Sequence, residues 1–243
     1  MEENIYLLAL VYIPEIGPVS IRKLISAFGS PEAVFKAGVK GLASVDGISP
    51  KKAECIRNFS GWKLIEKDLE RLKKSGVRAV TYKMEGYPEA LLSSEADAPV
   101  VLYIKGDIIP EDKYAIAVVG SRKPTHYGIT VTETLTSELS SMGFTVVSGL
   151  ARGIDTAAHV AALKSGGRSI AVLGSGIDVP YPPENSGLME KLSGSGCVIS
   201  EFPPGTPPLS RNFPMRNRII SGLSLGVLVA EASANSGALI TAR

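Results

Sequence analysis

The sequence predicts an α/β protein whose larger domain is an extended Rossmann-like, doubly wound and mostly parallel sheet, preceded by a small all-helical domain. From residue 115 onward, short and almost purely apolar segments alternate with helical patterns, which is typical of parallel strands covered by helices on both faces. Residues 1–64 instead show short helical patterns separated by tight turns. With 243 residues, the chain is long enough for one large and one small domain.

The composition limits the class of protein. Apolar residues make up 44% and charged residues 21% of a chain whose net charge is only +2, so binding of a polyanion would depend on a local basic site. Cys55 and Cys197 match neither a zinc spacing nor a disulfide framework, which favours a reducing, cytoplasmic location. The apolar stretch near the N-terminus has no Lys or Arg before it and is interrupted at Glu15 and Gly17. We therefore expect neither a signal peptide nor a membrane span.

Two turns within residues 1–64 resemble helix-hairpin-helix modules of the SAM-like type. The segments "IPEIGPVS" (13–20) and "VDGISPKK" (45–52) each place a glycine beside an isoleucine in a tight turn that precedes a new helix. Backbone amides in such hairpins can hold a DNA phosphate, but many helical hairpins only pack against their neighbours. The sequence leaves both interpretations open.

The remaining elements follow in order along the chain. Residues 63–76 predict a charged amphipathic helix, and residues 77–82 and 100–105 predict two strands. Further strands are predicted at 115–120, 144–149, 168–174, 196–201 and 225–232, and helices at 126–142, 154–164, 184–192 and 215–223. We therefore assign residues 1–64 to the helical domain and residues 65–243 to the Rossmann-like domain.

The loops after these strands decide what the sheet can bind, because ligands of open α/β sheets bind at the carboxyl ends of the strands. The first loop, Gly120-Ser121-Arg122-Lys123, lacks the G-x-G-x-x-G fingerprint of a dinucleotide site, and no G-x-x-x-x-G-K-[ST] motif occurs. The loop at 174–185 begins "GSGIDV" but leads to "YPP" rather than directly into a helix. The common nucleotide motifs are therefore not favoured, and no cofactor is expected.

Several of these loops nevertheless carry groups that bind phosphate. Arg122 can form two hydrogen bonds with a phosphate, aided by amides at the start of the next helix. In "SGLARG", small residues and Arg152 precede another helix. The segment after the fourth of these strands adds Arg211, Arg216 and Arg218. Phe213 lies among them, and an aromatic ring beside arginines suits a nucleic-acid base next to its phosphates. A salt bridge would explain any one arginine, and a core position would explain Phe213, but their shared edge of the sheet favours a binding site.

A catalytic site is not indicated. The chain has two histidines, His126 and His159, and no nucleophile at a spacing typical of a catalytic pair; Ser121 and Ser148 lack an evident base. We interpret His159 as a packed polar residue and Asp155 as a group that stabilises the first turn of its helix. Four acidic residues follow strands or begin helices near them: Asp155, Asp178, Glu201 and Glu231. Their spacing does not establish a metal site, so we expect neither catalytic residues nor metal ligands.

The order and spacing of these motifs resemble the DNA-processing protein A family, also called DprA or Smf. The segments that carry the resemblance are "VVGSRKPTHYG", "VVSGLARGIDTAAHVAAL", "IAVLGSGIDVPYPPEN", "VISEFPPG", "FPMRNRIISGLS" and "LVAEASANSGALITAR", within residues 82–243. The resemblance implies a domain that binds single-stranded DNA without a nucleotide cofactor and that forms a homodimer. It also implies that the protein protects incoming DNA and loads the RecA recombinase onto it during natural transformation in competent cells, although the sequence leaves a general role in recombination open.

The resemblance also implies roles for individual residues. The loop after the first parallel strand would form a phosphate pocket, the next loop would shape its neighbour, and the segment around Phe213 would continue the DNA-binding surface. The predicted DNA-binding residues are Gly120, Ser121, Arg122, Lys123, Ser148, Gly149, Arg152, Gly153, Asp155, Arg211, Phe213, Arg216, Asn217 and Arg218.

One departure from the family pattern bears on these expectations. The chain ends at Arg243 within an apolar helical pattern, whereas family members normally continue. We therefore expect it to be truncated at its C-terminal end, which leaves its oligomeric state open.

The alternative from another class is a nucleotide phosphoribohydrolase of the lysine-decarboxylase-like Rossmann group. The P-G-G-x-G-T-x-x-E loop of that group carries a catalytic glutamate, and "ANSGALITAR" lacks both this glutamate and the second glycine. We therefore expect a binding protein rather than an enzyme.

Overall fold

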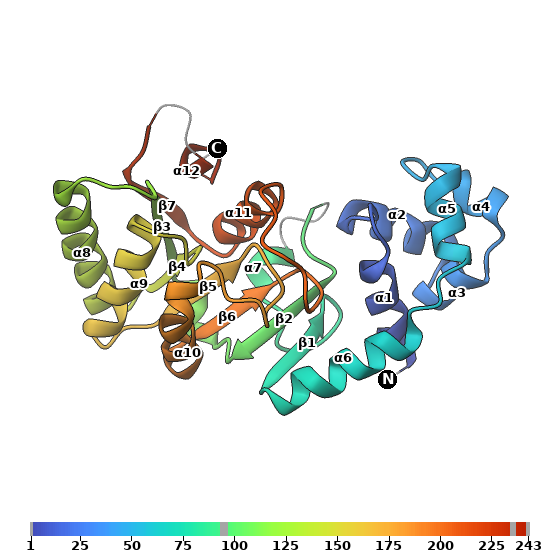
Figure 1. Cartoon of the computed structure of the whole chain (residues 1–243), viewed down its shortest axis with the longest axis horizontal. Helices are drawn as coiled ribbons and strands as arrows, with labels where there is room; N and C mark the ends of the chain where they lie inside the picture. The colour runs from blue at the N-terminus through green and yellow to red at the C-terminus, as the bar shows by residue number, and fades with distance from the viewer. Residues whose placement is uncertain (1, 93–96, 234–236, 242–243) are drawn as a thin grey trace. The chain divides into compact units, whose positions relative to one another are not determined.

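The computed structural model describes residues 2–92, 97–233 and 237–241 (Figure 1). By packing, the chain divides into two units, the first made of Met1–Tyr87 with Ser94–Leu102 and the second of Pro88–Ser93 with Tyr103–Arg243. The domain boundary expected between residues 64 and 65 stays a prediction. Among the described residues, no helix combines the length and apolarity needed to cross a membrane.

The helices of the first unit begin where the sequence supplies caps. The hydroxyl of Ser30 accepts a hydrogen bond from the Ala33 amide at 3.1 Å, and that of Ser49 accepts one from the Lys52 amide at 3.3 Å. Proline occupies the first turn of α2, α3 and α5, where its missing N–H costs nothing. The elements are α1 Glu2–Tyr12, α2 Pro18–Phe28, α3 Pro31–Lys36, α4 Val39–Ala43, α5 Pro50–Arg57, α6 Trp62–Lys74 and β1 Val77–Thr81.

The two turns singled out in the sequence share one backbone geometry. Between α1 and α2, Glu15 has a φ of 64° and is followed by the buried Ile16. Between α4 and α5, Gly47 has a φ of 83° and is followed by the buried Ile48. In each hairpin a residue in the left-handed region reverses the chain and the next side chain anchors the turn in the core.

The sheet has the strand order β1-β2-β6-β5-β4-β3-β7. β2 runs antiparallel to β6, whereas the pairs from β6 through β5, β4 and β3 to β7 are parallel. The bounds of these strands are β2 Val101–Gly106, β3 Ala115–Gly120, β4 Thr145–Ser148, β5 Ser169–Leu173, β6 Cys197–Ser200 and β7 Gly226–Glu231. From β3 the chain proceeds through β4, β5 and β6 toward one side of the sheet. It then returns to form β7 on the other side of β3. The connections therefore change direction between β3 and β7.

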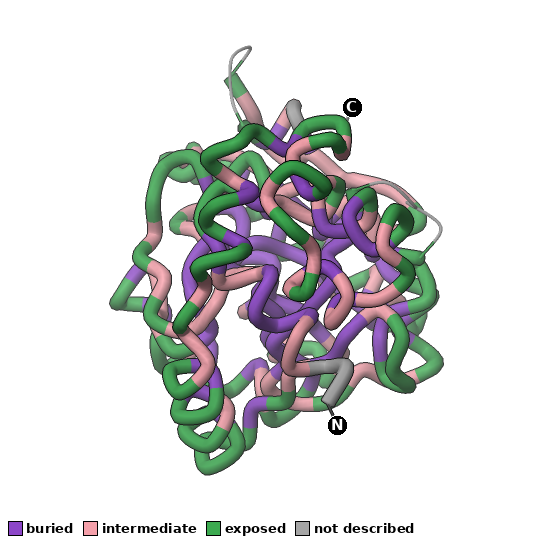
Figure 2. The backbone as a smooth tube through the Cα atoms, turned by 90° about the vertical axis from the view of Figure 1, so that its right-hand side faces the viewer, coloured by how far each residue is buried: buried purple, intermediate pink, exposed green. Residues whose placement is uncertain are grey.

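Helices cover both faces of the sheet in the second unit. α8, α9 and α10 contact one another in sequence and pack on one face, and α7, α11 and α12 form the other layer (Figure 1). Their bounds are α7 Glu89–Leu92, α8 His126–Ser141, α9 Ile154–Lys164, α10 Ser186–Ser195, α11 Asn212–Gly222 and α12 Gly237–Thr241. Ala158 and Ala162 of α9 pack with Val118 and Val146, so this helix approaches the strands closely. The backbone coloured by burial shows the same buried interior beneath exposed outer turns (Figure 2).

The predicted fold class is confirmed, and the predicted strands from residue 115 onward each contain the observed ones. One helix begins earlier than predicted. We expected a helix from residue 215, but α11 begins at Asn212 and holds Pro214 in its first turn, where proline is tolerated. Phe213 therefore lies on a helix rather than in a loop.

Candidate nucleic-acid interface

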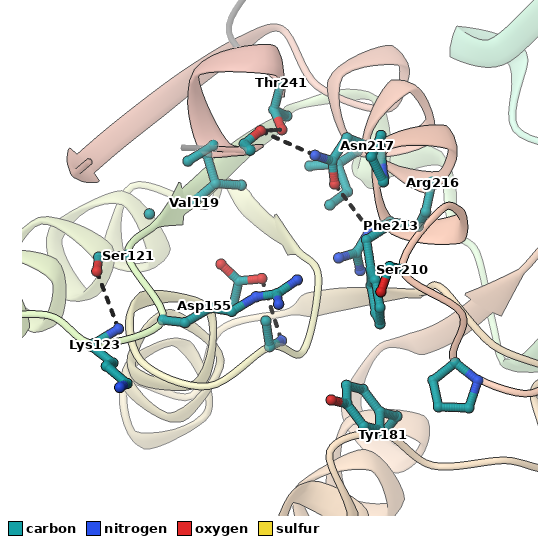
Figure 3. Close-up of a pocket in the computed structure, with 18 of the residues that line it drawn as sticks. Val119, Ser121, Lys123, Asp155, Tyr181, Ser210, Phe213, Arg216, Asn217 and Thr241 are labelled. Atoms are coloured by element: carbon teal, nitrogen blue, oxygen red, sulfur yellow. Dashed lines mark hydrogen bonds between the residues drawn. The ribbon is translucent and has the colours of Figure 1, made fainter. Parts of the chain in front are cut away.

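A cleft of about 610 Å³ lies at the carboxyl edge of the sheet, where the connections reverse direction at β3 and β7. Figure 3 places Ser121 and Lys123 on one side of it, Phe213, Ser210 and Tyr181 on the other, and Asp155 between them. The lining residues are Val119, Gly120, Ser121, Arg122, Lys123, Ala151, Asp155, Tyr181, Pro208, Ser210, Phe213, Pro214, Arg216, Asn217, Ile220, Ser233, Gly237, Ala238 and Thr241. Eight of the predicted DNA-binding residues are among them: Gly120, Ser121, Arg122, Lys123, Asp155, Phe213, Arg216 and Asn217.

The loop after β3 is held by its backbone, which leaves its basic side chains at the surface. The amide of Ser121 donates to the Glu231 carbonyl at 2.7 Å, and the Ser121 carbonyl accepts from the Ile154 amide at 3.1 Å. The Ser121 hydroxyl accepts from the Lys123 amide at 3.1 Å. Arg122 and Lys123 are exposed. The loop thus presents two cations on a fixed backbone.

Two aromatic rings form the opposite wall of the cleft. A Cβ added at Gly174 would lie 2.7 Å from the Phe213 ring, so this ring packs directly on the backbone that follows β5. The Tyr181 ring is 5.7 Å from the Phe213 ring at an interplanar angle of 42°, and the Arg122 guanidinium is 5.1 Å from the centre of the Phe213 ring. Arg122 and Tyr181 therefore both lie beside the Phe213 ring in the cleft.

Tyr181 was absent from the sequence prediction. Its signal was available, because "VPYPPEN" places an aromatic residue in the loop that follows a predicted parallel strand. That position alone did not show that the loop reaches across to the first turn of α11.

Arg216 forms the floor of the cleft rather than its surface. Its side chain is only 3% exposed, and its Nη1 donates to the carbonyl of Gly149 at 2.6 Å and also to that of Val172. A Cβ at Gly149 would overlap the guanidinium, so glycine is needed for this approach. Burial lowers the pKa of Arg216 to about 10, against an opposing effect of the Asp155 carboxylate. Arg216 therefore remains a cation at neutral pH and joins the ends of β4 and β5.

Asp155 is also buried and structural in its contacts. It lies in the first turn of α9, and its carboxylate accepts a hydrogen bond from the Ala151 amide at 3.3 Å. Burial raises the pKa of Asp155, while the positive charge of Arg216 and hydrogen bonds from the preceding loop act in the opposite direction. These contacts join Asp155 to the loop before α9, and its expected role in stabilising the first turn of the helix stays a prediction.

The other six predicted residues do not line the cleft. Ser148 is buried and donates to the Val118 carbonyl at 2.6 Å. Arg152 is paired with Glu184 and Arg218 with Glu201. Gly149 supports Arg216, and Gly153 has a φ of 78° against the loop after β3. Arg211 is exposed at the N-cap of α11.

The acidic residues near the strand ends are engaged separately. Asp178 accepts from the Gly205 amide at 2.8 Å, Glu201 pairs with Arg218, and Glu231 accepts from Thr125. In the described part of the chain, no group of three or more His, Cys, Asp or Glu side chains is arranged to hold a metal ion.

His159 is fully buried behind the cleft. Its Nδ1 is 2.7 Å from the Ser169 hydroxyl, which itself donates to the Val146 carbonyl, and its Nε2 has no hydrogen-bond partner among the described residues. Burial, and to a lesser extent the charge of Arg216, lower the pKa of His159 to about 3. The native protein therefore holds this ring neutral, as expected for a packed polar residue.

This burial predicts a pH dependence of stability. Between about pH 6.5 and pH 3 the unfolded chain binds a proton at His159 that the native protein does not, so the free energy of unfolding falls as the pH is lowered through this range. From pH 7 to pH 4 the loss due to this group is expected to be about 3 kcal/mol. Urea unfolding of the wild type and of His159→Asn across this range measures it, because the carboxylates titrate in both proteins. Parallel pH profiles of the two proteins would contradict the assignment.

Comparison with known proteins agrees with the resemblance seen in the sequence. A family model described as DNA recombination-mediator protein A matches residues 78–243, and one described as a SAM-like helix-hairpin-helix tandem matches residues 7–59. Protein Smf of Synechocystis sp. is 38% identical over 249 residues, which cover 99% of this chain and 61% of that protein. DNA processing protein DprA of Streptococcus pneumoniae is 49% identical over 150 residues, which cover 62% of this chain and 53% of that protein. The chain thus spans about half to three-fifths of the length of the curated relatives it matches.

Solved structures give the same result. DNA processing protein A from Streptococcus pneumoniae matches with a TM-score of 0.80 at 35% identity, over 99% of this chain and 81% of that chain. DNA processing protein A from Helicobacter pylori, whose structure concerns the binding of single-stranded DNA by that protein, matches with a TM-score of 0.60 at 31% identity, over 68% of this chain and 74% of that chain. With a family model that matches residues 78–243, these similarities show that the chain belongs to the DNA recombination-mediator protein A family, the DprA/Smf family that its motifs resemble.

Proposed function

We propose that this protein binds single-stranded DNA in the cleft at the carboxyl edge of the sheet and acts in DNA processing as a recombination mediator rather than as an enzyme. The observation that carries the proposal is that Arg122 and the Tyr181 ring both lie beside the Phe213 ring in the cleft. A guanidinium next to half-buried aromatic rings suits a phosphate and a neighbouring base of an unpaired strand, since bases that are not paired can stack on side chains. The described binding of single-stranded DNA by the Helicobacter pylori relative supports the same conclusion.

The charges of the cleft favour a polymer over a single nucleotide. Arg122 and Lys123 are both exposed on one side of the cleft. Neighbouring phosphates of one strand can contact these two cations together. Binding of this kind weakens steeply with salt and depends little on base sequence.

Replacing Arg122 by alanine is expected to weaken binding of oligo-dT by roughly 10- to 100-fold, because a charge-assisted contact with a phosphate is lost. The slope of log K against log salt should fall in magnitude by about 0.7 for the lost contact. Fluorescence anisotropy titrations of the wild type and the variant with oligo-dT, duplex DNA and dTMP at several salt concentrations measure both quantities. Arg122→Lys keeps the charge but not the planar guanidinium, so its affinity for oligo-dT should lie between those of the wild type and Arg122→Ala.

Lys164→Ala is the matched control, since it removes one exposed cation at the end of α9, at the opposite edge of the sheet. It should leave the affinity unchanged within a factor of about two. Equal affinity of the wild type for duplex and single strand, or unchanged binding by Arg122→Ala, would refute the proposed site.

The finer parts of the proposal concern partners. We infer a homodimer in the cytoplasm that protects single-stranded DNA and loads RecA onto it, in natural transformation or in general recombination. The test is whether the protein accelerates RecA assembly on strands coated with single-strand-binding protein, while light scattering gives the mass in solution. No acceleration with DNA binding intact would remove the mediator role and keep the DNA-binding role.

The enzymatic alternative predicts a different product. A phosphoribohydrolase would release free base from a nucleoside monophosphate, which chromatography detects directly. We expect no base to be released, because the acidic groups near the strand ends are engaged in structural contacts. Release that depends on Glu231 or Asp155 would overturn the proposal of a binding protein.

A further inference from the structure

The first turn of α8 is the position where an α/β sheet of this kind offers an anion site. α8 follows β3 directly after the loop of residues 121–125, and the free amides and dipole of a helix N-terminus attract negative charge. In dinucleotide-binding proteins of this fold, the pyrophosphate of the cofactor lies at this position. Here Thr125 is the N-cap, and its hydroxyl accepts from the Gly128 amide at 3.1 Å.

A carboxylate of the protein itself lies at this turn. The Thr125 amide is 3.1 Å from each carboxylate oxygen of Glu231, and the Thr125 hydroxyl donates to Glu231 Oε2 at 2.6 Å. In a capping box, the acidic side chain comes from the third residue of the helix and reaches back to the amide of the N-cap. In α8 that third residue is Gly128, and the carboxylate comes from the end of β7 instead.

Glycine at position 128 makes room for this arrangement. A Cβ there would overlap Glu231 Oε2, and the three atoms nearest to it would all belong to the Glu231 side chain. The pairing of β3 with β7 shifts register between Val119 and Gly120, so that Gly120 lies opposite Glu231. The cap of α8, the glycine at position 128 and the register shift between β3 and β7 thus all involve Glu231.

The same residue holds both ends of the loop that carries Arg122. Its carbonyl accepts from the Ser121 amide at 2.7 Å, and its carboxylate accepts from the Thr125 amide. Arg122 therefore extends from a segment fixed on either side by Glu231, toward the Phe213 ring.

We infer that Glu231 fills the anion position of α8 with its own carboxylate and thereby sets the ligand specificity of the cleft. A phosphate of a mononucleotide or dinucleotide is excluded from the helix N-terminus, and the phosphate contact is left to Arg122. The exclusion of phosphate follows from the contacts of Glu231 alone. The phosphate contact of Arg122 rests on the proposed function. Glu231 is a specificity-determining and positioning residue, with no role as a base or acid.

The experiment compares binding of inorganic phosphate and of dTMP to the wild type, Glu231→Ala and the double variant Gly128→Ala/Glu231→Ala by titration calorimetry. Removal of the internal carboxylate should strengthen phosphate binding by about tenfold, the value expected for an anion at an accessible helix N-terminus. The added methyl group at position 128 should abolish this gain, because it occupies the space that the carboxylate held. Glu133→Ala is the control, since it removes an exposed negative charge from the same helix and should produce no gain.

Because Glu231→Ala loses a helix cap, it should unfold at a lower temperature, and the rise of its Tm with added phosphate gives a second measure of binding. A folded Glu231→Ala that binds phosphate no better than the wild type would overturn the inference. A gain that survives Gly128→Ala, or that Glu133→Ala reproduces, would overturn it as well. Oligo-dT binding by the wild type is measured in parallel, and its absence would refute the proposed function without affecting the phosphate comparison.

Discussion

Arg216→Met is expected to lower the free energy of unfolding by about 3–5 kcal/mol. The guanidinium bonds the carbonyls at the ends of two strands, and methionine would leave the carbonyls of Gly149 and Val172 buried without this donor. It would also leave the buried Asp155 carboxylate without its nearby positive charge. Urea unfolding followed by circular dichroism measures the change.

Arg211→Met is the matched control for this prediction, because Arg211 is exposed one turn earlier in the same segment. Its effect on the free energy of unfolding should stay within about 0.5 kcal/mol. A stable Arg216→Met protein with weakened DNA binding would show that Arg216 contacts DNA directly, as the sequence alone predicted. A destabilised Arg216→Met protein would identify Arg216 as a residue that supports the cleft.

Gly153→Ala is expected to cost about 3 kcal/mol or more, since two unfavourable effects combine at this residue. Its φ of 78° and ψ of −123° lie in a region that only glycine enters readily. In addition, a Cβ would overlap the carbonyl oxygen of Ser121 and lie 2.7 Å from the Pro124 ring. The loop that carries Arg122 would have to move, so oligo-dT affinity should fall together with stability.

Gly143→Ala separates these two effects. Gly143 also has a positive φ, of 87°, but a Cβ there would meet nothing within 4 Å. This variant should lose about 1 kcal/mol and keep its affinity for DNA. Equal unfolding midpoints for the two variants would show that the close approach between the loops carries no energetic weight.

Much of this protein could be predicted from local pattern. The short apolar strands, their spacing and the glycine-rich turns after them are properties of neighbouring residues, and they predicted the doubly wound sheet and the edge at which the cleft lies. The prediction that Arg122 and Phe213 share one edge of the sheet was of the same kind, because both residues follow strands whose carboxyl ends meet at that edge.

The roles of the other arginines could not be assigned in this way. The buried residues of α11 include Asn212, Arg216, Ile219 and Ile220, which recur at helical spacing, so Arg216 lies on the face of the helix that packs into the protein. Arg218 lies on another side of that helix and pairs with Glu201. Three arginines in one short segment therefore differ in role because of helix phase.

The fold, the edge of the sheet at which the cleft lies and the residue types at that edge follow from the sequence, because they depend on periodicity and on the direction of parallel strands. Which groups face the cleft, which support it and which fill it depends on tertiary packing. The contact of Thr125 with Glu231 joins residues 106 positions apart, and that of Arg216 with Gly149 joins residues 67 positions apart. Such contacts arise from the packing of distant segments, and no local pattern in the chain encodes them.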